Sequence, residues 1–111
     1  MKSDAVYLQH IPDAIQKIES YVTVGRDVFM STSHRQDAVI RQFEIIREAT
    51  KGFSRNLRSK HPEVPWQRIA GLRDFLIHEY FDVDLVALWD LTQISLSGFK
   101  EQVTSVLKEL A

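Results

Sequence analysis

Residues 73–80 read RDFLIHEY, so a cation, a carboxylate, an imidazole and a phenol stand within one short stretch. In a helix each residue advances about 100° around the axis. On that spacing the apolar residues of this part of the chain share one broad side: Ile69, Leu72, Phe75, Leu76 and Val83. A continuous apolar side is typical of a helix that packs onto a core, so the stretch predicts a helical fold.

The same helix would carry a second, narrower seam opposite its core side, formed by Ala70, Asp74 and Ile77. In a short chain, a second copy related by a two-fold axis is the simplest partner for such a seam. Arg73 and His78 flank the seam on opposite edges and diverge by about 140° within one helix. A dimer would bring Arg73 of one subunit towards His78 of the other.

The polar residues of this stretch suit proton transfer on a phosphate. Asp74 and His78 are four residues apart and share a face, so the carboxylate can orient the imidazole. RNA is cleaved by its own 2′-hydroxyl when one group moves protons and a cation stabilises the charged transition state. His78 and Arg73 are suitable groups for those two tasks. These residue types are also common at surface and boundary positions, so the spacing alone leaves both readings open.

Composition limits the class of protein. The chain has 111 residues, 44% of them hydrophobic, and no cysteine. We expect one domain over residues 1–111 without disulfides or thiol chemistry. No apolar run approaches the roughly 20 residues of a membrane span, so we expect a cytoplasmic protein without a membrane partner.

The remaining chain repeats the helical pattern without strand-like alternation. We expect a helix over residues 4–23, in which Pro12 marks either a bend or the end of a separate first turn, and which Gly25 ends. A connector that tucks Val28, Phe29 and Met30 onto the core follows. A second helix is expected over residues 34–60, opened by a capping box over residues 33–36.

A stiff loop over residues 61–65 then leads to Trp66, which opens the helix of the central stretch. The last helical segment has a buried stripe of Leu85, Leu88, Trp89, Thr92, Phe99, Val103, Val106 and Leu110, with a kink expected at Ser97-Gly98. The predicted fold class is all-α, an antiparallel four- to five-helix bundle that forms a homodimer.

Positive charge is concentrated in the middle of the chain. Residues 41–73 carry eight Lys/Arg and three Asp/Glu, a net +5, which leaves −6 for the rest of a chain whose net charge is −1. Arg47, Lys51, Arg55 and Arg58 recur at helical spacing and form a basic ridge on the expected second helix. Such a ridge can follow the phosphates of RNA, although an ordinary solvated helix face has the same composition.

Other site chemistry has little support. The four histidines (10, 34, 61 and 78) lack second ligands at metal spacing, and no glycine-rich phosphate loop or nucleophile elbow is present. We therefore expect neither a metal nor a cofactor.

The pattern Arg73-x4-His78-x-Tyr80 resembles the Arg-x4-His-x-Tyr motif of the HEPN superfamily, and more narrowly that of HepT-like toxins of toxin–antitoxin pairs. Residues 65–72 before it, residues 81–84 and Trp89 after it, and the helix around Arg41, Glu44, Glu48 and Ala49 extend the resemblance over nearly all the chain. Two positions depart from it: Arg47, where relatives usually carry Gly, and Pro12.

The resemblance implies a HEPN-like helical homodimer with its cleft at the two-fold axis. It implies metal-independent endoribonuclease activity through Arg73 and His78. It also implies a partner antitoxin, a minimal nucleotidyltransferase that can attach adenylyl groups to Tyr80. Two other classes stay open: a non-catalytic helical module that binds a nucleotide or nucleotidyltransferase, and a purely structural bundle.

Overall fold

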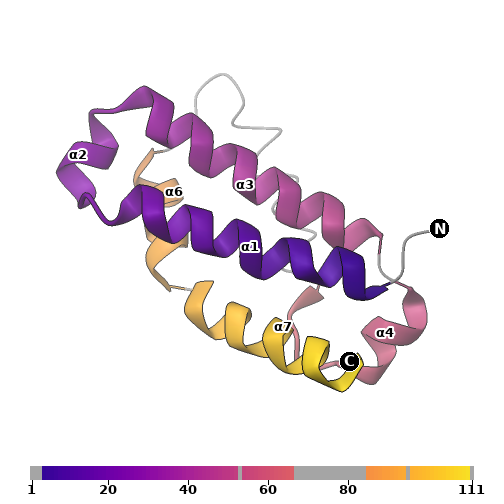
Figure 1. Ribbon diagram of the computed structural model, residues 1–111. Helices are drawn as coiled ribbons and strands as arrows, with labels where there is room; N and C mark the ends of the chain where they lie inside the picture. The colour runs from indigo at the N-terminus through magenta and orange to yellow at the C-terminus, as the bar shows by residue number, and fades with distance from the viewer. Residues whose placement is uncertain (1–3, 53, 67–84, 95, 111) are drawn as a thin grey trace.

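The computed structural model describes residues 4–52, 54–66, 85–94 and 96–110. Every regular element in these ranges is a helix, which confirms the all-α prediction for this part of the chain. In chain order the helices are α1 (Asp4–Val22), α2 (Arg26–Met30), α3 (Ser33–Lys51), α4 (Arg55–Lys60), α6 (Leu85–Ile94) and α7 (Leu96–Leu110) (Figure 1). The number of helices in the bundle and the homodimer stay predictions.

Helix α1 forms the centre of the described structure, with α3 along one side and α7 along the other, both antiparallel to it (Figure 1). Their apolar residues at intervals of three and four meet in one core. Its fully buried members include Leu8, Ile11, Ile15 and Ile18 of α1, Val39, Phe43 and Ile46 of α3, and Val103 and Val106 of α7. Burying one such side chain contributes about 1.5–3 kcal/mol, so the three helices hold each other in place.

Pro12 lies inside α1, which runs without interruption from Asp4 to Val22. The alternative of a separate first turn is therefore wrong. Gly25 does follow the end of this helix, as predicted. Its N–H bonds the Val22 carbonyl at 3.1 Å, and its φ of 93° is a conformation that glycine adopts without strain.

The connector after Gly25 is the short helix α2, whose Phe29 is fully buried. The Phe29 ring lies 5.4 Å from that of Trp89 on α6, centroid to centroid. Val28, however, points outwards and is exposed. The apolar plug therefore exists but depends mainly on Phe29, which joins α2 to α6 at one end of the molecule.

The predicted capping box at residues 33–36 is wrong. Helix α3 begins at Ser33 with Thr32 as its N-cap residue, and the Thr32 side chain makes no capping hydrogen bond. The Gln36 amide instead donates to the carbonyls of Phe29 and Met30, at 2.9 and 3.1 Å. Because those carbonyls end α2 and need donors, Gln36 serves the preceding helix rather than its own.

The predicted helix over residues 34–60 is two helices, α3 and α4. Gly52 caps the end of α3, and the Asp4 carboxylate accepts hydrogen bonds from the Ser54 N–H (3.0 Å) and hydroxyl (2.8 Å). The Ser54 Oγ in turn accepts from the N–H of Leu57 at 3.1 Å and so caps α4. Contacts with the start of α1 thus accompany the break.

The C-terminal prediction holds in part. Leu88, Thr92, Phe99, Val103 and Val106 are buried as expected. Leu110 is exposed, because it is the last residue of α7 and the core ends before it. The boundary between α6 and α7 falls between Ile94 and Leu96, so Ser97 and Gly98 lie within α7 and do not separate the two halves.

None of the described helices combines the length and apolar character that crossing a membrane requires.

Candidate functional site

Four predicted site residues, Arg73, Asp74, His78 and Tyr80, fall in residues 67–84, outside the described residues. The Ala70/Asp74/Ile77 seam falls there as well. Their roles in catalysis, modification and pairing therefore stay predictions. What the structure describes is the surface of α1, α3 and α4 and the loop that leads to Trp66.

The basic ridge is divided between two helices. Arg47 and Lys51 lie on α3, whereas Arg55 and Arg58 lie on α4, beyond the turn at Gly52. The four side chains also differ in exposure. Lys51 and Arg55 are exposed, Arg58 is half-buried, and the Arg47 side chain is only 16% exposed. Lys51 and Arg55 are therefore the ridge members best placed to meet a phosphate.

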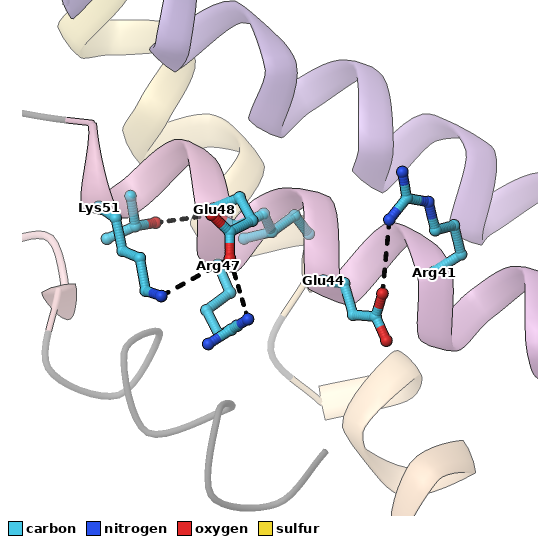
Figure 2. A network of polar contacts seen from close by, with 7 residues as sticks. Arg41, Glu44, Arg47, Glu48 and Lys51 are labelled. Atoms are coloured by element: carbon cyan, nitrogen blue, oxygen red, sulfur yellow. Dashed lines mark hydrogen bonds and ion pairs between the residues drawn. The ribbon is translucent and has the colours of Figure 1, made fainter. Parts of the chain in front are cut away.

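Glu48 pairs with both cations at the α3 end of the ridge (Figure 2). One Glu48 oxygen lies 2.9 Å from an Arg47 terminal nitrogen and 3.6 Å from Lys51 Nζ. The Nε of Arg47 is buried, and no partner for it appears in the part of the chain that the structure describes. Glu48 thus offsets half of the combined positive charge of Arg47 and Lys51. Its ion pair with Arg47 also keeps that side chain close to α3.

Arg58 links the two parts of the ridge. Its Nη2 donates to the carbonyl of Thr50 at 2.6 Å. Carbonyls in the last turn of a helix have no partner within that helix, so the guanidinium both closes the end of α3 and fixes α4 beside it. This contact brings the Arg58 guanidinium to the residue that precedes Lys51, despite the break between the helices.

A hollow of about 480 Å³ lies between α1 and α3 beside the ridge. We call it the α1–α3 hollow; its lining includes Tyr7, His10, Arg41, Ile45, Glu48 and Lys51. Lys51 belongs both to the hollow and to the basic ridge. The rings of Tyr7 and His10 meet edge to face, with centroids 6.4 Å apart and planes at 72°.

Sequence reasoning did not identify Tyr7 and His10 as site residues. Their spacing of three does place them on one face of α1. That signal is weak without knowledge of which helix lies opposite. The family resemblance included Arg41 but did not make it a site residue. In the structure its guanidinium lies 3.5 Å from Glu44, one turn along α3 (Figure 2).

The loop between α4 and Trp66 is held firmly against α7. The two ring nitrogens of His61 face carboxylates, Nδ1 at 3.2 Å from Glu63 and Nε2 at 3.4 Å from Glu109. Trp66 Nε1 donates to the His61 carbonyl at 2.9 Å, and Gln102 donates to the Glu63 carbonyl at 3.0 Å. The chain is thus anchored just before the segment that carries the motif.

No group of three or more His, Cys, Asp or Glu side chains suited to a metal ion occurs within the described ranges.

Comparison with known proteins identifies a family. The ribonuclease HepT-like family matches residues 11–106. A protein of Thermococcus cleftensis named "Probable ribonuclease HepT" is 36% identical over 108 residues, which cover 96% of this chain and 98% of that protein. A "Putative RNase" of Caldanaerobacter subterraneus subsp. tengcongensis is 36% identical over 110 residues, 98% of each chain.

One relative is longer. A Methanocaldococcus jannaschii protein named "Gamma-glutamylcyclotransferase and putative RNase" is 38% identical over 112 residues, which are 99% of this chain but only 50% of that protein. No solved structure matches the chain at a significant level. The family match spans most of the chain and two relatives align over almost their whole length, which confirms the predicted resemblance: the chain belongs to the ribonuclease HepT-like family.

Proposed function

We propose that this chain is a metal-independent endoribonuclease and the toxin of a toxin–antitoxin pair. The observation that carries the proposal is the family match over residues 11–106, which spans an intact Arg73-x4-His78-x-Tyr80 pattern. The family match supports the ribonuclease class. The residue roles, the toxin role and the antitoxin rest on the motif and on the resemblance stated above.

The proposed reaction uses the 2′-hydroxyl of the RNA as its nucleophile. The 2′-oxygen attacks the adjacent phosphorus and loses its proton, the bond from phosphorus to the 5′-oxygen breaks, and the leaving oxygen gains a proton. A cyclic phosphate and a 5′-hydroxyl result. In this reaction His78 moves a proton, Arg73 stabilises charge on the phosphate, and Asp74 orients the imidazole.

The proposed site is composite and lies at a homodimer two-fold axis. On the expected helix Arg73 and His78 would diverge by about 140°, so a single subunit would not present both to one phosphate. The basic ridge would lead RNA to this site. The exposure of Lys51 and Arg55 supports that role, and the pairing of Arg47 with Glu48 makes it the weakest contributor.

Cleavage of a labelled single-stranded RNA tests the proposal. We expect wild type to cut in the presence of EDTA, and we expect Arg73→Ala and His78→Ala each to lose roughly a hundredfold or more in rate. Circular dichroism of each variant should match that of wild type. A folded His78→Ala protein that cuts as fast as wild type would remove His78 from the mechanism.

A non-catalytic module that binds a nucleotide or a nucleotidyltransferase is the second candidate. Purified wild type that binds such a ligand but releases no RNA fragments would favour it.

A further inference from the structure

The α1–α3 hollow combines aromatic rings, an apolar floor and two exposed cations. We propose that it receives one nucleotide of single-stranded RNA, with the base against Tyr7 and His10 and the phosphate at Arg41 and Lys51. The inference rests on the proposed ribonuclease function and adds an RNA-binding subsite to it. The residues of this subsite lie outside the motif in the sequence.

The size and walls of the hollow fit a nucleotide. Its volume of about 480 Å³ falls in the range of roughly 300–1,000 Å³ that small-molecule sites occupy. Ala49 is buried and Ile45 is half-buried against the core, so both offer apolar surface to a base. Any base has a π-face, and one stacked on an aromatic side chain raises affinity by roughly tenfold.

The aromatic rim is held in position before a ligand arrives. A Cβ on Gly52 would stand 2.6 Å from atoms of the Tyr7 ring, so the absence of a side chain at Gly52 is what lets the ring lie this close to the backbone. His10 meets Tyr7 edge to face. Both residues project from α1, a helix fixed by the core, and a preorganised surface loses little entropy on binding.

The cations of the hollow are free to turn to a phosphate. The Arg41 side chain is 69% exposed and its contact with Glu44 is 3.5 Å. The Lys51 side chain is 51% exposed, and its nitrogen lies 3.6 Å from Glu48. Exposed ion pairs of this kind contribute little, whereas a phosphate offers a charged acceptor to either cation.

Among the described residues that line the hollow, Glu48 is the one acidic side chain. Its carboxylate repels a phosphate, and one of its oxygens lies 2.9 Å from Arg47 and 3.6 Å from Lys51. Neutralising Glu48 should therefore strengthen RNA binding. A residue that served only the fold would, on substitution, weaken binding or leave it unchanged.

The hollow opens onto the basic ridge through Lys51. The Arg58 guanidinium contacts the carbonyl of Thr50, the residue before Lys51, and the exposed Arg55 is on the same short helix. We expect a strand seated in the hollow to meet these cations as it leaves. This continuity favours a nucleotide within RNA over a free mononucleotide.

The test measures fluorescence anisotropy of a labelled single-stranded RNA decamer, with His78→Ala in every protein to prevent cleavage. We expect Arg41→Gln and Tyr7→Leu each to weaken binding roughly tenfold, and Tyr7→Phe, which keeps the ring, to bind like its parent. We expect Glu48→Gln to bind about threefold more tightly. Lys17→Gln, an exposed lysine of α1 outside the hollow, is the matched control and should have no effect.

Competition with AMP and UMP separates the two sources of a nucleotide. We expect each to displace the decamer only at much higher concentration than unlabelled decamer does; equal potency would make this a free-nucleotide site and overturn the proposal. If all the hollow variants keep the affinity of their parent and Arg55→Glu loses binding, the hollow is not the nucleotide subsite. The ribonuclease proposal would stay intact. Wild type that neither binds nor cuts RNA would remove both.

Discussion

Gly52 lies where the ring of Tyr7 leaves no room for a side chain. Its φ of −77° suits any residue, so the constraint is contact and not backbone strain. In Gly52→Ala the new methyl group must displace the ring, and we expect a loss of about 1–3 kcal/mol in unfolding free energy. Urea denaturation followed by circular dichroism measures this.

Gly98 provides the matched control for that substitution. It is exposed within α7, and a Cβ there would meet nothing within 4 Å. Gly98→Ala should therefore stabilise the protein by about 0.5–1 kcal/mol, because alanine loses less backbone entropy than glycine in a helix. Two alanine variants that shift stability in the same direction would contradict this explanation of Gly52.

Tyr80 is the proposed acceptor of adenylyl groups. Its hydroxyl oxygen would attack the α-phosphorus of ATP, lose its proton and release pyrophosphate, with the antitoxin as the enzyme. On the expected helix Tyr80 would lie about two turns from Arg73, so the added negative charge would repel RNA there. We expect Tyr80→Phe to keep RNase activity and to escape inactivation, because only the hydroxyl is removed. Intact-mass spectra that show equal adenylyl gain in wild type and Tyr80→Phe would place the acceptor elsewhere.

At the scale of elements, the ridge on α3 and α4 makes a prediction about salt. Arg55 is exposed, so Arg55→Glu should weaken RNA binding whatever the sequence and should reduce the slope of log affinity against log salt by about one. Anisotropy from low to moderate salt measures the slope. Lys108→Glu, an exposed lysine of α7, is the control. An unchanged slope in Arg55→Glu would make the ridge an ordinary solvated face.

The helical class and the buried faces were predictable from spacing alone, since intervals of three and four read directly as one side of a helix. The break after α3 was not. Leu57 is buried like Ile46 and Thr50 before the break, so hydrophobic spacing shows no interruption at Gly52. The contacts that accompany the break come from Asp4 and Tyr7, about fifty residues away in sequence. Because these partners are distant, the pattern of neighbouring residues does not predict the contacts.

The candidate site, like the fold, could be predicted from the sequence only in part. Charge spacing identified Lys51 and Arg55, whose exposure fits the prediction. It did not reveal that Arg47 is held by Glu48 and Arg58 by the end of α3, because pairing depends on side-chain position and not only on charge. Tyr7 and His10 were missed because their chemistry appears only when α1 lies beside α3.

For the whole molecule, the prediction is a homodimer in which each active site takes Arg73 from one subunit and His78 from the other. Sedimentation at micromolar concentration should give twice the chain mass of 12.9 kDa. Mixing two inactive variants then tests whether the site draws residues from both subunits.

An Arg73→Ala subunit still carries His78, and a His78→Ala subunit still carries Arg73, so a mixed dimer contains one complete site. After unfolding and refolding together at equal amounts, two inactive proteins should recover about a quarter of wild-type activity, because half of the dimers are mixed and each has one working site of two. Refolding each variant alone is the control. A mixture of folded dimers that stays as inactive as its components would mean that both residues act from the same subunit.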